Sequence, residues 1–387
     1  MRILYISSAN GMGGGSSVAL FNIVREMIAR GHEVKVVTAM DQGPLLEEFH
    51  NIGCPYQQLS VRNNIYPRSW NPILFLPRLL LMLWSNIKAK AGLRRVIQEF
   101  RPDIVHTNVG TMNIAVSLCQ HRKIPHIWHQ REYQDLDFNC HFFPTIKHFM
   151  QQSHSKGNYN ICITKGIFQY RKFREGIDRV IYDGVFPQQK TSNIQVAEKQ
   201  KYVLFVGRVE PAKGTLDLVR VFVTFHSMHP DYRLVIAGAI GNRKYYAKCT
   251  EIVENTGLKD YVDFLGNRTD VYSLMTNASM LVVPSRFEGF GFITAEAMLN
   301  FCPVVGRNTG GTKEQFDRGL EYFNEEIGLR FNNDTEMLER MCQVVETDLT
   351  PMCHKAREMV TTFYTSEYCV NQIEEYYRFV LENSKQV

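Results

Sequence analysis

Ser285-Arg-Phe-Glu-Gly-Phe-Gly-Phe-Ile-Thr-Ala-Glu-Ala-Met298 follows directly on the apolar run Met280-Leu-Val-Val-Pro284. The run predicts a short buried strand of a parallel sheet, and the residues after Phe292 have helical composition. Gly289 and Gly291 therefore lie in a turn from a strand into a helix. Ligands of open α/β sheets bind at such turns, outside the carboxyl ends of the strands. The stretch thus predicts both the fold class and a binding site.

Two carboxylates bracket this turn: Glu288 lies on the loop and Glu296 in the first turns of the predicted helix. Carboxylate oxygens accept hydrogen bonds from hydroxyl groups, and the backbone N–H groups of a helix N-terminus favour an anion. Vicinal hydroxyls, as in a ribose or a hexose, match that arrangement. The same residues also fit a plain helix start in which the glutamate interacts only with the helix dipole.

A second stretch supplies positive charge: Tyr202-Val-Leu-Phe-Val-Gly-Arg-Val-Glu-Pro-Ala-Lys-Gly214. A hydrophobic strand ends there at Gly207-Arg208 and is followed by Lys213-Gly214. An arginine forks onto phosphate oxygens and a lysine supplies a point charge, so Arg208 and Lys213 suit a nucleoside diphosphate. We interpret the two stretches as one site for a sugar and a nucleotide.

The alternation of strands and helices predicts an α/β protein with doubly wound parallel sheets. With 387 residues the chain is too long for one ordinary core, which indicates two domains. Residues 187–201 are polar and look like a linker, after which the strand–helix pattern restarts. We therefore expect one Rossmann-like domain over 1–186, a second over 187–365, and a helix over about 366–381.

Composition describes a well-packed globular protein, with 44% hydrophobic and 21% charged residues. The nine cysteines are scattered and form no Cys-x-x-Cys pair, which indicates neither a disulfide framework nor a zinc site and favours a reducing cytosol. The N-terminal stretch enters a predicted strand at once and has no apolar segment long enough for a signal peptide, and no apolar run approaches the length of a spanning helix. The expected location is the cytoplasm.

Basic residues concentrate in one segment. Between residues 62 and 101 there is one acid, Glu99, and eight basic residues: Arg62, Arg68, Arg78, Lys88, Lys90, Arg94, Arg95 and Arg101. The same segment carries the apolar run Ile73 to Trp84, and a predicted helix over 73–100. Apolar bulk with flanking cations suits a peripheral contact with the anionic inner face of a membrane, although an ordinary amphipathic helix covering a sheet has the same pattern. Nucleic acid is a poorer partner, because stacking aromatics and binding motifs are missing.

In order along the chain, these motifs resemble the retaining glycosyltransferases of family 4, which have the GT-B fold. The motifs are Gly14-Gly15, Pro102-Asp-Ile-Val-His106, Ile124-Pro-His-Ile-Trp-His129, Ile181-Tyr-Asp-Gly-Val185, Val206-Gly-Arg-Val-Glu-Pro-Ala-Lys-Gly214, the pair Glu288 and Glu296, and Gly310-Gly-Thr-Lys-Glu314. The resemblance implies two Rossmann-like domains facing across a cleft. It implies acceptor binding by 1–186, nucleotide-sugar binding by 187–365, and a C-terminal helix, 366–387, that packs back on the first domain.

The resemblance also implies a role for each site residue. Arg208 and Lys213 would hold the diphosphate next to Gly207, and Glu296 the ribose. Glu288 and the backbone of Phe290, Gly291 and Phe292 would meet the donor sugar, and His129 would lie near its reacting carbon. Gly14 and Gly15 would let the backbone approach the diphosphate or the acceptor, and Gly266 and Arg268 lie where the nucleobase is expected. The implied reaction needs no metal or other cofactor, and its acceptor is a glycan or a lipid-linked oligosaccharide of surface polysaccharide synthesis.

Three positions depart from the family pattern. Phe301 stands where a glycine is usual, Asp183 replaces the commoner asparagine before Gly184, and Ser279 replaces an aspartate. None of the three removes a chemical group from the expected site, so they bear on donor preference rather than on activity.

Other functions remain open. Asp135-Leu-Asp137 spells an Asp-x-Asp of the kind that holds a divalent ion with a diphosphate, but no strand precedes it. Gly11-Met-Gly-Gly-Gly-Ser16 approaches a dinucleotide fingerprint, but Ser16 stands at the third glycine and the expected acid is missing. A sugar-nucleotide epimerase or a phosphorylase on the same fold, and an inactive sugar-binding partner subunit, are the remaining alternatives.

Overall fold

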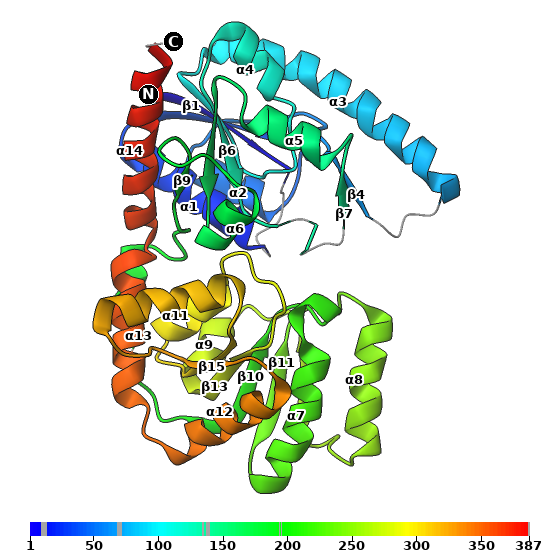
Figure 1. Cartoon of the computed structure of the whole chain (residues 1–387), viewed down its shortest axis with the longest axis vertical. Helices are drawn as coiled ribbons and strands as arrows, with labels where there is room; N and C mark the ends of the chain where they lie inside the picture. The colour runs from blue at the N-terminus through cyan, green and yellow to red at the C-terminus, as the bar shows by residue number, and fades with distance from the viewer. Residues whose placement is uncertain are drawn as a thin grey trace. The chain divides into compact units, whose positions relative to one another are not determined.

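The computed structural model describes residues 1–8, 14–67, 72–133, 135–136, 140–192, 194 and 196–385. The chain divides into two units, each built around its own parallel sheet (Figure 1). Unit 1 is Met1–Pro187 with Thr365–Val387, and unit 2 is Gln188–Tyr364. The boundaries expected from the sequence, after residues 186 and 365, lie one residue from each of these.

The described residues of unit 1 contain a seven-stranded sheet with the order β3-β2-β1-β5-β6-β8-β9, and neighbouring strands pair in parallel. Its strands are β1 (Arg2–Ser7), β2 (Glu33–Thr38), β3 (Tyr56–Gln58), β5 (Ile104–Thr107), β6 (His126–Gln130), β8 (Asn158–Cys162) and β9 (Arg179–Val180). A separate antiparallel pair joins β4 (Ile65–Pro67) to β7 (Cys140–Phe142). Because consecutive strands are linked by crossovers, the sheet needs helices to cover its faces.

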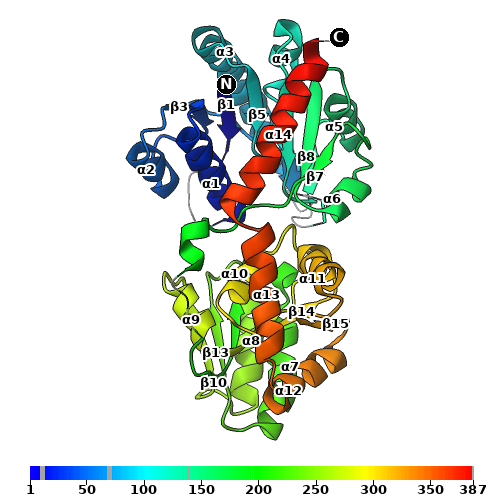
Figure 2. The same cartoon turned by 90° about the vertical axis from the view of Figure 1, so that its left-hand side faces the viewer.

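The helices of unit 1 are α1 (Gly15–Ala29), α2 (Pro44–Asn51), α3 (Pro72–Phe100), α4 (Val116–Arg122), α5 (Ile146–Ser153), α6 (Lys165–Tyr170) and α14 (Ser366–Lys385). The last helix returns from the far end of the chain and runs beside α1 (Figures 1 and 2). Val370, Ile373 and Tyr377 of α14 are completely buried in one core cluster with Ile3 and Tyr5 of β1. Burial at every third or fourth residue explains why the C-terminal segment forms a helix.

Unit 2 has a six-stranded parallel sheet with the order β12-β11-β10-β13-β14-β15. Its strands are β10 (Gln200–Val206), β11 (Arg233–Ala237), β12 (Val262–Gly266), β13 (Ala278–Val283), β14 (Val304–Arg307) and β15 (Leu329–Phe331). Its helices are α7 (Thr215–Met228), α8 (Arg243–Asn255), α9 (Val271–Asn277), α10 (Phe292–Leu299), α11 (Gly310–Phe323), α12 (Asp334–Glu346) and α13 (Thr350–Phe363). The expected doubly wound α/β architecture is therefore confirmed in both units.

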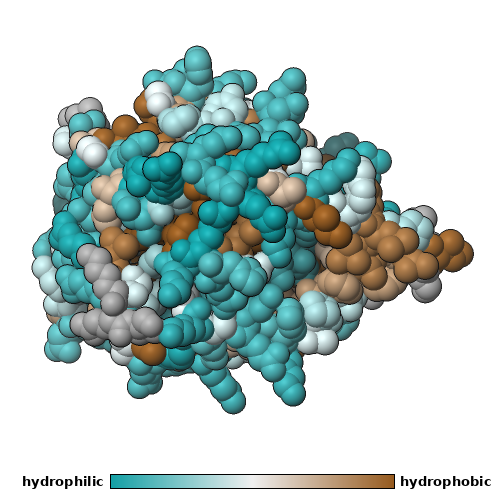
Figure 3. Space-filling view, turned by 90° about the horizontal axis from the view of Figure 1, so that it is seen from above, coloured by the Kyte–Doolittle hydropathy of each residue, from teal (hydrophilic) through white to brown (hydrophobic). Residues whose placement is uncertain are grey.

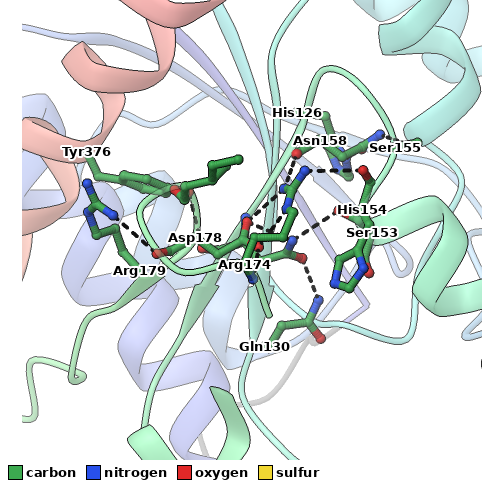
Figure 4. Close-up of polar contacts among 12 residues, drawn as sticks. His126, Gln130, Ser153, His154, Ser155, Asn158, Arg174, Asp178, Arg179 and Tyr376 are labelled. Carbon is green, nitrogen blue, oxygen red and sulfur yellow. Dashed lines mark hydrogen bonds and ion pairs between the residues drawn. The ribbon is translucent and has the colours of Figure 1, made fainter. Parts of the chain in front are cut away.

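A buried polar network ties the outer strands of unit 1 to α14 (Figure 4). Asp178 accepts hydrogen bonds from the backbone and side-chain nitrogens of Asn160 and from Arg174. Tyr376 of α14 donates its hydroxyl proton toward the carbonyl oxygens of Asn160 and Ile177. The side chain of Asp178 is satisfied by these donors, so we assign the network a structural role.

Within the basic segment, Pro72–Phe100 forms the long helix α3, whose two ends pack differently, and Arg68 of the segment lies outside the described residues. Ala89, Leu93, Val96 and Ile97, toward the C-terminal end of the helix, are buried against the sheet of unit 1. Nearer its N-terminus the helix instead leaves large apolar side chains in solvent: Ile73, Leu76, Leu80, Leu81, Trp84 and Ile87. The space-filling view shows a largely brown projection where this part of α3 lies (Figure 3). Among the described residues, no helix is both long and apolar enough to cross a bilayer.

The described part of the predicted linker, residues 187–201, makes specific contacts with unit 2. Lys199 donates to the carbonyl oxygen of Thr276 at 2.7 Å, Arg357 donates to the carbonyl oxygen of Thr191, and β10 already begins at Gln200. The polar composition predicted a loose connection, but polar side chains can also attach a segment to the surface of a domain through hydrogen bonds. Here they fix the start of unit 2.

Candidate active site

The predicted strand-to-helix turn lies where the strand order of unit 2 reverses. β10 and β13 are neighbours in the centre of the sheet, and the chain leaves β10 toward one edge and β13 toward the other. In an open α/β sheet the loops after such a pair diverge to opposite faces and leave a binding crevice at the carboxyl ends. Arg208 and Lys213 follow β10, and the glycine turn follows β13, so both stretches come to one place.

Close backbone contacts hold the two loops together. Gly214 has φ 72°, and a Cβ atom there would lie 2.4 Å from the carbonyl oxygen of Pro284. The backbone N–H of Arg286 donates to the carbonyl oxygen of Ala212 at 3.0 Å. Only glycine allows both this conformation and this approach, which explains the Lys213-Gly214 sequence.

Lys213 and Glu288 form an ion pair. The Lys213 Nζ lies 2.8 Å from Oε2 and 3.1 Å from Oε1 of Glu288, and both side chains are mostly buried. The sequence predicted the two residues at one site but assigned them to different parts of a ligand. In the structure each fixes the position of the other.

Residues of α11 hold the glycine turn in place through hydrogen bonds and close backbone contacts. Gln315 donates from Nε2 to the carbonyl oxygens of Phe290 at 2.7 Å and Gly291 at 3.0 Å. A Cβ atom at Gly311 would lie 2.0 Å from the carbonyl oxygen of Phe290, and Gly310 makes a similar approach to Glu288. The glycine pair at the start of α11 thus lets that helix support the loop that carries Glu288 and leads into Phe292, the first residue of α10.

Glu296 is half-buried on α10, and burial raises the pKa of its carboxyl group to about 7. Tyr272 donates its hydroxyl proton to Glu296 at 3.4 Å, and the positive charge of Lys190 lies close enough to oppose the shift. Lys190 also lies 5.5 Å from the centre of the Tyr272 ring. The surroundings of Glu296 therefore combine a hydroxyl donor, an aromatic ring and a cation.

The remaining predicted residues of unit 2 lie along the same carboxyl edge of the sheet. Arg208 is exposed and pairs with Glu210 at 3.0 Å, and Arg268 pairs with Asp270 at 2.6 Å. Gly207 directly follows β10 and Gly266 is the last residue of β12, and these two strands flank β11. Each arginine pairs with a carboxylate two residues further along the chain, so an anionic ligand could compete with that local partner.

Gly14 and Gly15 lie at the start of α1 in unit 1. Gly14 is the N-cap, with an extended backbone, and among the described residues a Cβ atom there would meet nothing within 4 Å. Its conformation and its described neighbours therefore give no structural reason for glycine. The first half of the dinucleotide-like stretch Gly11 to Ser16, through Gly13, lies outside the described residues.

His129 is completely buried at the carboxyl end of β6. Its Nδ1 lies 3.1 Å from Nε2 of His106 and 3.3 Å from a guanidinium nitrogen of Arg131. Arg131 also pairs with Asp183 and donates from Nε to Asn108 at 3.1 Å. Burial, and then the charge of Arg131, lower the pKa values of His129 and His106 well below the ordinary value, so both rings are neutral.

Several residues of the site were missed by sequence reasoning. Gln315, Tyr272 and Lys190 surround the glycine turn and Glu296, whereas His106 and Arg131 surround His129. Their side chains are common polar types without a motif spacing of their own, except that His106 ends a predicted strand. Asp183 was noticed only as a departure from a pattern, and its partner Arg131 gives that departure a physical reason.

Of the Asp-x-Asp pair, the structure describes Asp135. Asp137 lies outside the described residues. Asp135 pairs with Arg171 at 2.7 Å and accepts from the Tyr170 hydroxyl at 2.8 Å. Among the residues that the structure describes, no three His, Cys, Asp or Glu side chains group as metal ligands.

Two family models match the chain and together span most of it. Glycosyltransferase Family 4 matches residues 13–189, and Glycosyl transferases group 1 matches residues 188–359. The chain belongs to the family 4 glycosyltransferases. The match to the second model includes both loops of the site in unit 2 and the Lys213–Glu288 pair.

The sequence and the structure are also similar to those of individual proteins. N-acetyl-alpha-D-glucosaminyl L-malate synthase of Bacillus anthracis is 22% identical over 96% of both chains. A lipopolysaccharide core biosynthesis mannosyltransferase of Rhizobium meliloti is 33% identical, over 34% of this chain and 36% of its own length. Among solved structures, Anabaena HepE in complex with UDP is 18% identical with a TM-score of 0.76, covering 97% of this chain and 99% of HepE. A glycosyltransferase of Rickettsia africae is 17% identical with a TM-score of 0.77, covering 99% of both chains. The glycosyltransferase thus has the GT-B fold.

Proposed function

We propose that this glycosyltransferase moves a hexose from a nucleoside-diphosphate sugar to a hydroxyl acceptor with retention of anomeric configuration. The Lys213–Glu288 pair at the point where the strand order reverses carries the proposal, because it places a cation and a hydroxyl acceptor side by side. Related folds have been solved with UDP, with UDP and glucose and with UDP-glucose, which supports a donor of this class.

The proposed chemistry follows from charge. Breaking the anomeric C–O bond leaves negative charge on the departing diphosphate, and Lys213 and Arg208 would stabilise that charge together with the N-terminus of α10. The ammonium of Lys213 has three protons, so it can keep Glu288 in place while donating to a phosphate oxygen. Retention without a covalent intermediate would have the departing phosphate accept the proton of the acceptor hydroxyl, so positioning supplies much of the rate. Metal independence stays a prediction.

We propose a glycan or a lipid-linked oligosaccharide as the acceptor. Two observations support this class. Relatives with partial matches act in lipopolysaccharide core and Vi polysaccharide biosynthesis. The exposed apolar side chains of α3, with Lys88, Arg94 and Arg95 on the same helix, would also suit a peripheral contact with an anionic membrane at which such an acceptor is held.

Replacement of Lys213 tests the diphosphate assignment. We expect Lys213→Ala to lower turnover by roughly 100-fold or more, because one cation that stabilises the leaving group is lost. Lys201→Ala is the matched control, since Lys201 forms an exposed ion pair with Asp231 on the same unit. The assay measures transfer and donor hydrolysis with UDP-, GDP-, ADP- and dTDP-sugars. Normal turnover in Lys213→Ala, with its fold intact, would contradict the assignment.

A further inference from the structure

The two nitrogen atoms of His129 have different surroundings. Nδ1 faces His106 and Arg131, whereas Nε2 is buried and has no hydrogen-bond partner among the described residues. A buried polar atom without a partner is uncommon in folded proteins, and it costs free energy that a ligand atom would recover. Nδ1 of His129 therefore interacts with the protein, whereas Nε2 can interact with a ligand.

Arg131 determines which nitrogen carries the proton. A guanidinium group has five N–H donors and no acceptor, so the nitrogen that it approaches must accept. Arg131 approaches Nδ1 of His129 with a distance of 3.3 Å. In a neutral imidazole one nitrogen donates and the other accepts, so the proton of His129 is on Nε2.

The same reasoning extends outward from His129. Since Nδ1 of His129 accepts, Nε2 of His106 must donate to it at 3.1 Å, and Nδ1 of His106 then accepts from the Tyr377 hydroxyl at 2.6 Å. The Tyr377 oxygen lies 3.0 Å from the Tyr5 hydroxyl, so Tyr5 is the last residue in this series of hydrogen bonds. All four side chains are fully buried, so water does not compete with these hydrogen bonds.

We propose that His106 and Tyr377 are positioning residues that hold His129 as its Nε2–H tautomer, and that His129 is a fixed hydrogen-bond donor to an oxygen of the sugar substrate. The tautomer rests on the contacts of unit 1 alone, whereas the identity of the ligand oxygen rests on the proposed function. His129 is then not the base that removes the acceptor proton, because its available nitrogen already carries a proton. The C-terminal helix takes part through Tyr377.

Nitrogen NMR of the protein with ¹⁵N-labelled histidine tests the tautomer directly. Resonances of His129 and His106 are assigned from their loss in His129→Asn and His106→Asn. We expect a proton on Nε2 of His129 and a bare Nδ1, in the complete chain without substrate. A proton on Nδ1 of His129 would overturn the proposal, and this measurement does not depend on activity.

Variants of His106 test its positioning role. A carboxamide carries a donor and an acceptor on two atoms bound to one carbon, as a neutral imidazole does. The side chain in His106→Gln can therefore replace both hydrogen bonds of His106, and we expect this variant to keep most of the turnover. His106→Leu keeps the apolar volume without either group, and we expect kcat to fall roughly tenfold with a smaller change in the donor KM. Equal turnover in the two variants, both folded by circular dichroism, would overturn the role of His106.

Tyr5 provides a control for Tyr377. Replacing either tyrosine by phenylalanine removes one buried hydroxyl group from the same series of hydrogen bonds. In Tyr5→Phe the Tyr377 hydroxyl still donates to His106, so we expect nearly normal kcat. In Tyr377→Phe, and in the double variant Tyr5→Phe/Tyr377→Phe, we expect kcat to fall roughly fivefold. Equal losses in Tyr5→Phe and Tyr377→Phe would show a structural role only. If no sugar transfer is found in the native protein, the proposed function fails while the NMR result stands.

Discussion

Glu296 shows how one residue can link ligand binding to pH. Its carboxyl group is half-buried beside Tyr272, and burial raises its pKa to about 7 from the ordinary value of 4.5. An ionised carboxylate accepts hydrogen bonds from both hydroxyl groups of a ribose, whereas a protonated carboxyl group has one acceptor fewer. The charge of Glu296 therefore changes around pH 7.

Donor binding should strengthen as the pH rises through 7. Between pH 6 and pH 8 the ionised fraction of Glu296 rises from about one tenth to about nine tenths, so we expect the donor KM to fall up to about tenfold. Glu296→Gln has no carboxyl group, and its KM should be higher and nearly independent of pH. A pH-independent KM in the native protein would contradict the ribose assignment, as would an equal slope in the variant.

Folding stability should follow the opposite trend. Because the folded pKa exceeds the unfolded one, the folded state holds the proton more tightly, and the contribution of Glu296 is complete below pH 4.5 and is lost as the pH rises through 7. We expect Glu296→Gln to raise the free energy of unfolding above pH 7, on the order of 1–3 kcal/mol. Thermal unfolding at pH 5 and pH 8 measures the difference between the two proteins. A variant no more stable than the native protein at pH 8 would refute this account.

At the level of single elements, the end of α10 explains the phenylalanine found where the family usually has glycine. Phe301 has φ 53°, and Cys302 donates to the carbonyl oxygen of Ala297 at 2.9 Å, which is a Schellman ending. Glycine adopts this left-handed conformation without strain. The Phe301 ring compensates, because it is buried against His354 and lies 4.6 Å from the Arg357 guanidinium carbon.

Two substitutions separate strain from packing at this position. Phe301→Ala and Phe301→Gly both remove the ring, which we expect to cost about 3 kcal/mol. Glycine also relieves the left-handed strain, so Phe301→Gly should be more stable than Phe301→Ala by about 1 kcal/mol. In an ordinary helix the order is reversed. Denaturant unfolding of both variants decides between the two orders.

The long helix α3 carries the membrane prediction. We expect the quadruple variant Lys88→Gln/Lys90→Gln/Arg94→Gln/Arg95→Gln to bind anionic vesicles at least tenfold more weakly, because each basic residue near the surface contributes about 1 kcal/mol. Sedimentation with anionic and zwitterionic vesicles measures the binding. A variant with the same loss of charge on exposed residues of unit 2, at Arg243, Lys244, Lys248 and Lys259, is the control. Membrane contact through α3 is contradicted if the native protein does not bind anionic vesicles, or if both variants lose binding equally.

Over the whole molecule, unit 1 is built from two distant parts of the chain. Cys369, Val370, Ile373, Tyr377 and Val380 of α14 are buried in the core of that unit together with β1. Unit 2 has a separate core that includes Phe205, Phe222 and Phe331. Removal of the C-terminal helix should therefore affect the two cores differently.

Truncation after Tyr364 tests this expectation. The exposed core of unit 1 should lose much of its protection against amide hydrogen exchange in β1 and α1, whereas β10 and β13 of unit 2 should stay protected. Hydrogen exchange followed by mass spectrometry compares the truncated and complete chains. Unchanged protection of β1 would show that α14 contributes little to the core of unit 1.

Sequence reasoning predicted those parts of the fold that depend on local pattern. Apolar runs such as Met280–Val283 and helical spacing such as that of α14 are visible in any short window. The short strands β3 and β15 and the pair of β4 and β7 were missed, because three residues give no measurable period. The polar composition at the start of unit 2 predicts a linker, because composition does not show which hydrogen bonds a polar segment makes.

By itself, the sequence determined the two doubly wound sheets, the glycine turn after β13 and the acidic and basic residues at the carboxyl ends of strands. These follow from spacing along the chain. The tertiary structure alone decided that Lys213 pairs with Glu288, 75 residues away, and that Tyr5 meets Tyr377, 372 residues away. Such contacts depend on strand order, on the packing of helices and on the direction of single side chains. The charge of Glu296 and the proton position on His129 are consequences of those contacts, so no local pattern could have given them.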